Sequence, residues 1–255
     1  MVHAVRRAAR IAGFAGITAS MLAAYTAADG MARAEDRDAL RDAWLGRWSG
    51  ALLRLFAVRV TVRGDVPGGD RGRIVVANHR SAIDIALLLR IFGGHMVSRA
   101  DLKGWPLVGA AARKVGTVFV DRSNKMSGAS AIQAMRDLLR KSRAVLVFPE
   151  GTTFEEDEVH PFHAGAFVAA RSAHAEIVPV GIAYESGSGA AFVGESFVSH
   201  LERMAGATPT RVVVRIGAPL GIDAGMRAGE MAEMARGAVQ ALVREARAEV
   251  DGVQT

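Results

Sequence analysis

The sequence contains no cysteine. The chain therefore has neither a disulfide framework nor a thiolate that could bind a metal or act as a nucleophile, and its redox compartment stays open. It also shows no internal repeat and no basic stretch interleaved with aromatic residues. These absences exclude a disulfide-stapled scaffold, a repeat architecture, cysteine-dependent catalysis and any recognisable nucleic-acid-binding motif.

The chain is rich instead in apolar residues and positive charge. Hydrophobic residues make up 50% of its 255 positions, and the formal net charge is +6. The mean hydropathy is +0.18 and the isoelectric point about 10.4. This combination favours attraction to anionic lipid surfaces over nucleic acid. The length suits one α/β domain with an appendage.

The first thirty residues predict a membrane-associated helix. Arg6, Arg7 and Arg10 precede an uncharged stretch, 11–28, which as a helix would be roughly 27 Å long, near the lower limit for spanning a bilayer. A cleaved signal peptide is the alternative, since the tripeptide at 32–34 fits a cleavage site. We favour an anchor with its basic flank in the cytoplasm, and whether it spans the bilayer or lies in one leaflet stays open.

The next stretch, 44–60, alternates apolar and basic residues and predicts an amphipathic helix. Its tryptophans suit either the headgroup zone of a membrane or packing against the domain, and the sequence favours neither. The Gly-, Asp- and Pro-rich segment 64–72 then marks the passage from this helical part to the α/β body. We therefore divide the chain into N-terminal membrane-anchoring helices, 1–63, and an α/β domain, 64–255.

Beyond residue 72 the periodicity alternates between strand and helix. This order predicts an α/β fold with a mostly parallel central sheet flanked by helices, preceded by the membrane-associated segment. Methionines in the last helix are expected to be core residues. The expected strands are 73–77, 115–120, 144–148, 176–183 and 211–216, and the expected helices are 81–90, 127–141, 164–173 and 228–250.

A histidine and an aspartate follow the first of these buried strands. His79 and Asp84 are five residues apart, which on one continuous helix would point them about 140° apart. With a turn between them and Ser81 as the N-cap, they can meet. A carboxylate on one imidazole nitrogen fixes the tautomer and leaves the other nitrogen as a base. The alternative is that Asp84 is only a cap and His79 only a loop residue.

A second loop follows the strand at 144–148. Gly151 allows a tight turn, and its amide, together with the amides and hydroxyls of Thr152 and Thr153, would face a ligand above the sheet. Glu150 would be an acid near that ligand. An ordinary βα turn is the alternative interpretation.

A third loop, 155–163, holds four carboxylates and two histidines. Their spacing fits no closed or catalytic metal site, so we interpret it as a solvated acidic loop and expect no metal.

Five segments together resemble the 1-acylglycerol-3-phosphate (lysophosphatidic acid) acyltransferase family, within the glycerolipid acyltransferases. The resemblance covers about residues 60 to 220, and the ordered blocks are far more specific than any one of them. The segments are NHRSAID at 78–84, RADLKGWPLVG at 99–109, GTVFVDR at 116–122, FPEGT at 148–152 and IVPVG at 177–181.

The resemblance implies a mechanism and a site. His79 would be the general base that removes a proton from a glycerol hydroxyl, oriented by Asp84. Arg122 would bind the phosphate of the acceptor, for which a guanidinium is suited. Without such a ligand, Asp121 and Arg122 would be a surface ion pair.

The resemblance also implies the substrates. Glu150 and Gly151 would bind substrate, the acyl donor would be acyl-CoA or acyl carrier protein, and no cofactor would be needed. The partners would be a lysoglycerolipid and a membrane surface, with no nucleic acid. The protein would sit at the cell membrane with its catalytic domain on the cytoplasmic face.

Two positions depart from the family pattern. Thr153 and His163 stand where many members carry Arg or Lys, which leaves room for a lysolipid without phosphate, such as lyso-ornithine lipid. Arg122, Arg99 and Lys103 could still bind a phosphate. A non-catalytic lipid-binding protein on the same fold is the remaining alternative, although none of the implied catalytic residues is lost.

Overall fold

The computed structural model describes residues 2–121, 123–223 and 225–252. The strands are β1 (Val58–Arg63), β2 (Arg73–Ala77), β3 (His95–Arg99), β4 (Val118–Val120), β5 (Ala144–Val147), β6 (Glu176–Tyr184) and β7 (Thr210–Ile216). The helices are α1 (Val2–Met31), α2 (Arg37–Leu55), α3 (Ile83–Phe92), the 3₁₀ helix η1 (Ala100–Gly104), α4 (Val108–Lys114), α5 (Lys125–Arg140), α6 (Gly165–Ala173), α7 (Phe197–Gly206) and α8 (Ala228–Val250).

The strands form one seven-stranded sheet in the order β1-β7-β6-β2-β5-β3-β4. β6 and β7 pair antiparallel, and every other neighbouring pair is parallel. The mostly parallel sheet expected from the alternating pattern is therefore confirmed. Because the loops after β2 and β5 leave neighbouring parallel strands at the same edge, the two loops singled out in the sequence lie next to each other.

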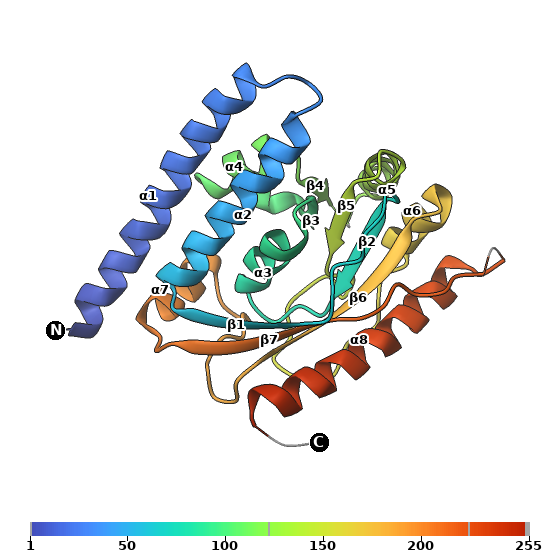
Figure 1. Ribbon diagram of the computed structural model, residues 1–255. Coiled ribbons are helices and arrows are strands. Elements are labelled where there is room, and N and C mark those ends of the chain that lie inside the picture. The colour runs from blue at the N-terminus through green and yellow to red at the C-terminus, as the bar shows by residue number, and fades with distance from the viewer. Residues whose placement is uncertain (1, 122, 224, 253–255) are drawn as a thin grey trace.

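Helices cover both faces of the sheet (Figure 1). Side chains alternate along β2, so that Val75 and Ala77 join a core with α2, α3 and α7. Ile74 and Val76 point the other way and join a second core with α5, α6 and α8. Burial on both faces explains why this strand reads as a continuous apolar run.

α1 lies along the outside of α2 (Figure 1) and is fixed to the body by polar contacts near both of its ends. Arg10 Nη1 donates to the carbonyl of Ala207 at the end of α7, at 2.8 Å. Nineteen residues further on, Asp29 is 2.7 Å from Lys114 Nζ on α4. Among the described residues, the stretch Ala4–Met31 is the one helix long and apolar enough to cross a membrane.

The predicted helix over 44–60 was wrong at its end, residues 56–60. α2 ends at Leu55, Ala57 takes a positive φ of 54°, and Val58–Arg63 forms β1 beside β7. The alternating β-branched residues of this segment fit a strand, and an exposed edge position tolerates its arginines. β1 falls within the N-terminal part of the division at residue 63, and that division itself stays a prediction.

The remaining predicted elements lie within a few residues of the observed ones, with one larger difference. The expected strand over 115–120 is only Val118–Val120, because α4 runs to Lys114 and Gly116 turns the chain at φ +75°. β3, η1, α4 and α7 were not predicted at all.

Candidate functional site

The loop after β2 is fixed by its first residue. The buried Asn78 side chain donates to the carbonyl of Ile182 at 3.0 Å and accepts from the amide of Ile182 at 2.8 Å. The side-chain amide thus continues the pairing of β2 with β6 for one more residue. This places the next residue, His79, at a defined point beyond the strand end.

The structure brings His79 and Asp84 together. His79 Nδ1 lies 2.9 Å from Asp84 Oδ2, and the Asp84 side chain is fully buried. The same oxygen accepts from the amides of Arg80 at 2.7 Å and Ser81 at 2.8 Å. Since a carboxylate can only accept, Nδ1 carries the proton and Nε2 is left as the basic nitrogen.

The capping arrangement differs from the predicted one. α3 begins at Ile83 with Ala82 as its N-cap, and the Ser81 hydroxyl accepts only a 3.3 Å bond from the Ile83 amide. Asp84 does accept from the loop amides before the helix, as its position three residues after Ser81 predicts. Its negative charge still lies in the first helical turn, where the helix dipole stabilises it.

The His79 ring is held flat against Phe148. The ring centroids are 3.9 Å apart and the planes differ by 6°. Together with the Asp84 bond, this stacking fixes both the position and the rotation of the imidazole, while the ring still borders the main cavity. A base held in this way loses little orientational freedom when a substrate arrives.

Glu150 binds the His79 loop from the neighbouring strand end. Its Oε2 accepts from the His79 amide at 2.7 Å and its Oε1 from the His160 amide at 3.0 Å. Burial raises the pKa of this carboxyl to about 7 against the lowering effect of those two bonds. Glu150 does not border the cavity, so it positions backbone here, and the substrate contact implied for it stays a prediction.

The other residues of the second loop do border the cavity. Gly151, at φ +85°, makes the turn, and Thr152 and Thr153 follow it along the cavity wall. The Thr153 hydroxyl donates to the carbonyl of Phe192, which ties this loop to the segment before α7. The three residues thus lie at the cavity, while the ligand contact expected of their amides and hydroxyls stays a prediction.

The cationic residues expected to bind a phosphate do not all lie at the main cavity. Arg99 borders the cavity, with its side chain 64% exposed and paired with Asp101 at 3.1 Å. Lys103 lies over the Phe119 ring, 5.1 Å from its centroid, and borders a separate hollow of about 470 Å³. Arg122 lies outside the described residues. These observations leave Arg99 as the predicted cation at the main cavity.

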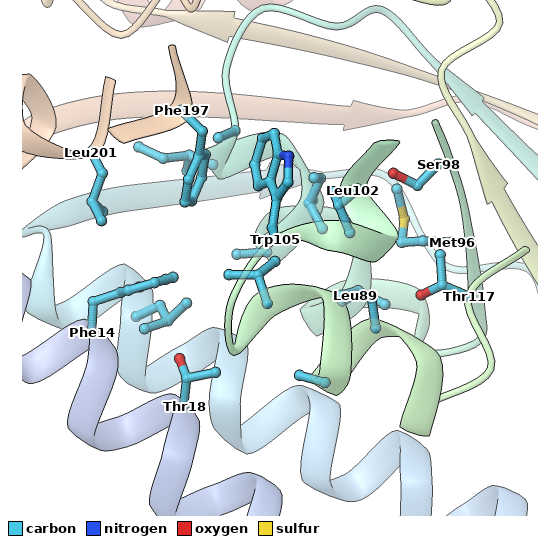
Figure 2. Close-up of a pocket in the computed structure, with 18 of the residues that line it drawn as sticks. Phe14, Thr18, Leu89, Met96, Ser98, Leu102, Trp105, Thr117, Phe197 and Leu201 are labelled. Atoms are coloured by element: carbon cyan, nitrogen blue, oxygen red, sulfur yellow. The ribbon is translucent and has the colours of Figure 1, made fainter. Parts of the chain in front are cut away.

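The main cavity has a volume of about 1010 Å³ and is lined mostly by apolar side chains. Figure 2 shows Phe14 and Thr18 of α1, Trp105, and Phe197 and Leu201 of α7 converging on it. Further wall comes from α2, α3 and α4. A space of this size and polarity, with the His79 imidazole and the threonines of the second loop at its border, fits a long aliphatic ligand with a reactive polar end.

Several residues of the site had no sequence signal. Tyr184, at the end of β6, donates its hydroxyl to Asp84 Oδ1 at 2.6 Å. His200 of α7 is buried, borders the cavity, and packs against the Phe192 ring at 4.5 Å. The Tyr184–Asp84 contact joins residues a hundred positions apart, which no local pattern reports.

The acidic loop is largely solvated, as expected: Glu155, Glu156 and Glu158 are exposed, and Asp157 is half-buried. Asp157 pairs with Arg247 of α8 at 2.6 Å and also with Arg80. The His160 ring stacks on Phe154 at 3.6 Å. Within the part of the chain that the structure describes, no cluster of three or more metal-ligating side chains is found.

The chain is similar to known acyltransferases. The family model described as Acyltransferase matches residues 58–183. Lyso-ornithine lipid O-acyltransferase of Pseudomonas aeruginosa is 34% identical over 209 residues, covering 78% of this chain and 75% of the relative. A 1-acyl-sn-glycerol-3-phosphate acyltransferase of Neisseria meningitidis is 28% identical over 57% of this chain and 56% of the relative.

A solved structure shares the fold. The 1-acyl-sn-glycerophosphate (LPA) acyltransferase PlsC from Thermotoga maritima superposes with a TM-score of 0.74 at 22% identity. The match covers 95% of this chain and 97% of the other. It therefore includes the N-terminal helices as well as the sheet.

Proposed function

This chain belongs to the acyltransferase family, and from that premise we propose that it transfers a fatty acyl group from acyl-CoA or acyl carrier protein to the free hydroxyl of a lysoglycerolipid. The observation that carries the proposal is the His79–Asp84 pair, joined at 2.9 Å, at the border of an apolar cavity of about 1010 Å³. The pair supplies a base, and the cavity accommodates an acyl chain.

The chemistry follows from the tautomer. His79 Nε2 takes the proton of the acceptor hydroxyl while the hydroxyl oxygen attacks the thioester carbonyl. The tetrahedral intermediate collapses, the carbon–sulfur bond breaks, and the departing thiolate takes the proton from the imidazolium. Asp84 stabilises the transient positive charge. The products are an ester and a thiol, with no net change in protons, and no cofactor takes part.

Replacing the base tests this mechanism. We expect His79→Ala to lower kcat at least about a hundredfold, the scale of general-base removal, and Asp84→Asn to lower it as well. Acyl transfer would be followed with labelled acyl-CoA and lysolipid in detergent micelles. A His79→Ala variant that keeps the full rate would refute the assignment. If the wild type transfers no acyl group to any lysolipid while binding it, the chain is a lipid-binding protein on this fold.

The leading acceptor is 1-acylglycerol-3-phosphate, giving phosphatidic acid. Arg99 at the cavity supports a phosphate-bearing headgroup. Lyso-ornithine lipid is the second candidate, because the relatives of that name from Pseudomonas aeruginosa and Brucella abortus align over 78% and 76% of this chain. Thr153 and His163, where many family members are cationic, support it too. A panel of both acceptors at equal concentration separates the two, since activity confined to lyso-ornithine lipid overturns the first.

We further place the protein on the cytoplasmic face of the cell membrane, with α1 lying in one leaflet. The contacts of Arg10 and Asp29 with the body keep about 28 Å of helix alongside the domain. A helix crossing the bilayer would carry one of these contacts away. Single cysteines introduced at Val5 and Met31, both exposed, test this because the chain has no other thiol. Both should react from the same side of sealed vesicles, and labelling from opposite sides would show a spanning helix.

A further inference from the structure

The Asp84 carboxylate uses its two oxygens differently. Oδ2 accepts from the His79 ring and from two loop amides. Oδ1 accepts a hydrogen bond of 2.6 Å from the Tyr184 hydroxyl. Tyr184 is 2% exposed and stands at the last position of β6, far from Asp84 in sequence but beside it in the fold.

We propose that Tyr184 is a positioning residue, whose hydroxyl holds the Asp84 carboxylate in the rotation that keeps Oδ2 on His79. The proposal rests on the function proposed above and deepens it. The end torsion of an aspartate side chain is broad, so the bonds to its oxygens decide its setting. With Tyr184 on Oδ1, rotation of the carboxylate breaks bonds on both sides at once.

Tyr184 keeps its proton over the working pH range. Burial, with the charge of Asp84, raises the pKa of the Tyr184 hydroxyl well above its usual value. The hydroxyl therefore remains a donor. The Tyr184 hydrogen bond also compensates the buried negative charge of Asp84 at Oδ1, because the other donors all bind Oδ2.

Other titratable and charged groups surround the hydrogen bonds among Tyr184, Asp84 and His79 and contribute to the pH dependence of the site. His79 and Arg80 lie on the loop before α3, and Arg80 is itself paired with Asp157. Glu150 approaches from the loop after β5. His200 of α7 lies 3.4 Å from the Ser81 hydroxyl, and burial lowers the pKa of its ring. These groups remain in place when Tyr184 is changed, so a difference between variant and wild type reports the hydroxyl.

The test is Tyr184→Phe, which removes the hydroxyl and keeps the ring. We expect kcat to fall about tenfold, on the scale of one hydrogen bond to a charged group, with the KM of donor and acceptor within twofold. The acid limb of the kcat profile should move to higher pH, because a carboxylate that has lost a donor keeps more negative charge and favours protonation of the His79–Asp84 pair. Unchanged kcat and an unmoved acid limb would overturn the proposal.

Ser186→Ala is the matched control. Ser186 lies two residues after Tyr184 and away from the cavity. Its hydroxyl donates to the Asp251 carboxylate at 2.8 Å. Its removal also deletes one hydroxyl–carboxylate bond, and it should leave kcat and the pH profile unchanged. An equal loss in both variants would show a general effect on the end of β6.

A double variant separates positioning from a structural contribution. If Tyr184 acts through Asp84, adding Tyr184→Phe to Asp84→Asn should lower kcat by less than twofold further. A full tenfold loss in that background would refute the inference. His79→Ala, measured alongside, keeps the two proposals distinct. If His79→Ala loses its kcat while Tyr184→Phe keeps the wild-type kcat, only the inference about Tyr184 is refuted.

A second probe avoids any loss of folding. The chain has two tyrosines, so 3-fluorotyrosine incorporated into a Tyr25→Phe background labels Tyr184. Fluorine makes the hydroxyl a stronger donor, and the acid limb should move to lower pH relative to the unlabelled Tyr25→Phe protein. A shift to higher pH, or none, would contradict the positioning role.

Discussion

Stability should fall with rising pH because of one carboxyl, Glu150. Its folded-state pKa is about 7 through burial, against an ordinary value of 4.5. Between these values the folded protein binds a proton that the unfolded chain has released. The contribution to stability is therefore complete below about pH 4.5 and is lost as pH rises through 7. This difference in the pKa of Glu150 corresponds to about 3 kcal/mol of stability.

Glu150→Gln removes this titration and makes the effect measurable. The amide accepts only one of the two hydrogen bonds, from His79 or His160, so the variant should be less stable at pH 5 by about 1–3 kcal/mol. Because the variant does not titrate at this position, the gap to the wild type should narrow by up to about 3 kcal/mol between pH 5 and pH 8.

Urea unfolding in mild detergent, followed by tryptophan fluorescence, measures the difference in the free energy of unfolding between variant and wild type. Histidines titrate in both proteins and cancel in the difference. Glu155→Gln, at an exposed position in the following loop, is the control. Its difference from the wild type in the free energy of unfolding should not change with pH. A flat gap for Glu150→Gln as well would refute the raised pKa and the reasoning from burial.

Two further predictions concern the cavity and the loop anchor. Ala112→Phe narrows the cavity, so the ratio of rates with hexadecanoyl-CoA and decanoyl-CoA should fall about tenfold. An unchanged ratio would place the acyl chain elsewhere. Asn78→Ala leaves the buried amide and carbonyl of Ile182 unpaired and should lower the free energy of unfolding by about 2–4 kcal/mol. Urea unfolding measures the loss, and a change below about 0.5 kcal/mol would contradict it.

The sequence was most informative where local pattern and burial coincide. The continuous aliphatic runs of β2, β5 and β6 are buried on both faces, and their alternation with helices predicted a mostly parallel sheet. The turn between His79 and Asp84 predicted their contact, since no single helix could bring them together. Each strand run, and the turn between His79 and Asp84, involves residues within about ten positions of each other.

The sequence was least informative where a side chain acts across the sheet. β1 was merged into a helix because its arginines continue the amphipathic pattern of α2, and the strand became evident only from its pairing with β7. Glu150 was expected near the ligand, yet its oxygens bind amides of two loops. Tyr184 reaches Asp84 over a hundred positions. Such contacts are set by tertiary packing, which the local pattern does not encode.

The wall of the cavity that comes from α1 and α2 limits how this protein can be simplified. A shorter chain that starts at β1, designed to dissolve without detergent, would keep every strand and the His79–Asp84 pair. It would also expose the compartment for the acyl chain to water on one side. Such a fragment should still fold around its sheet yet fail with long-chain donors, so trimming the N-terminus cannot give solubility and turnover together.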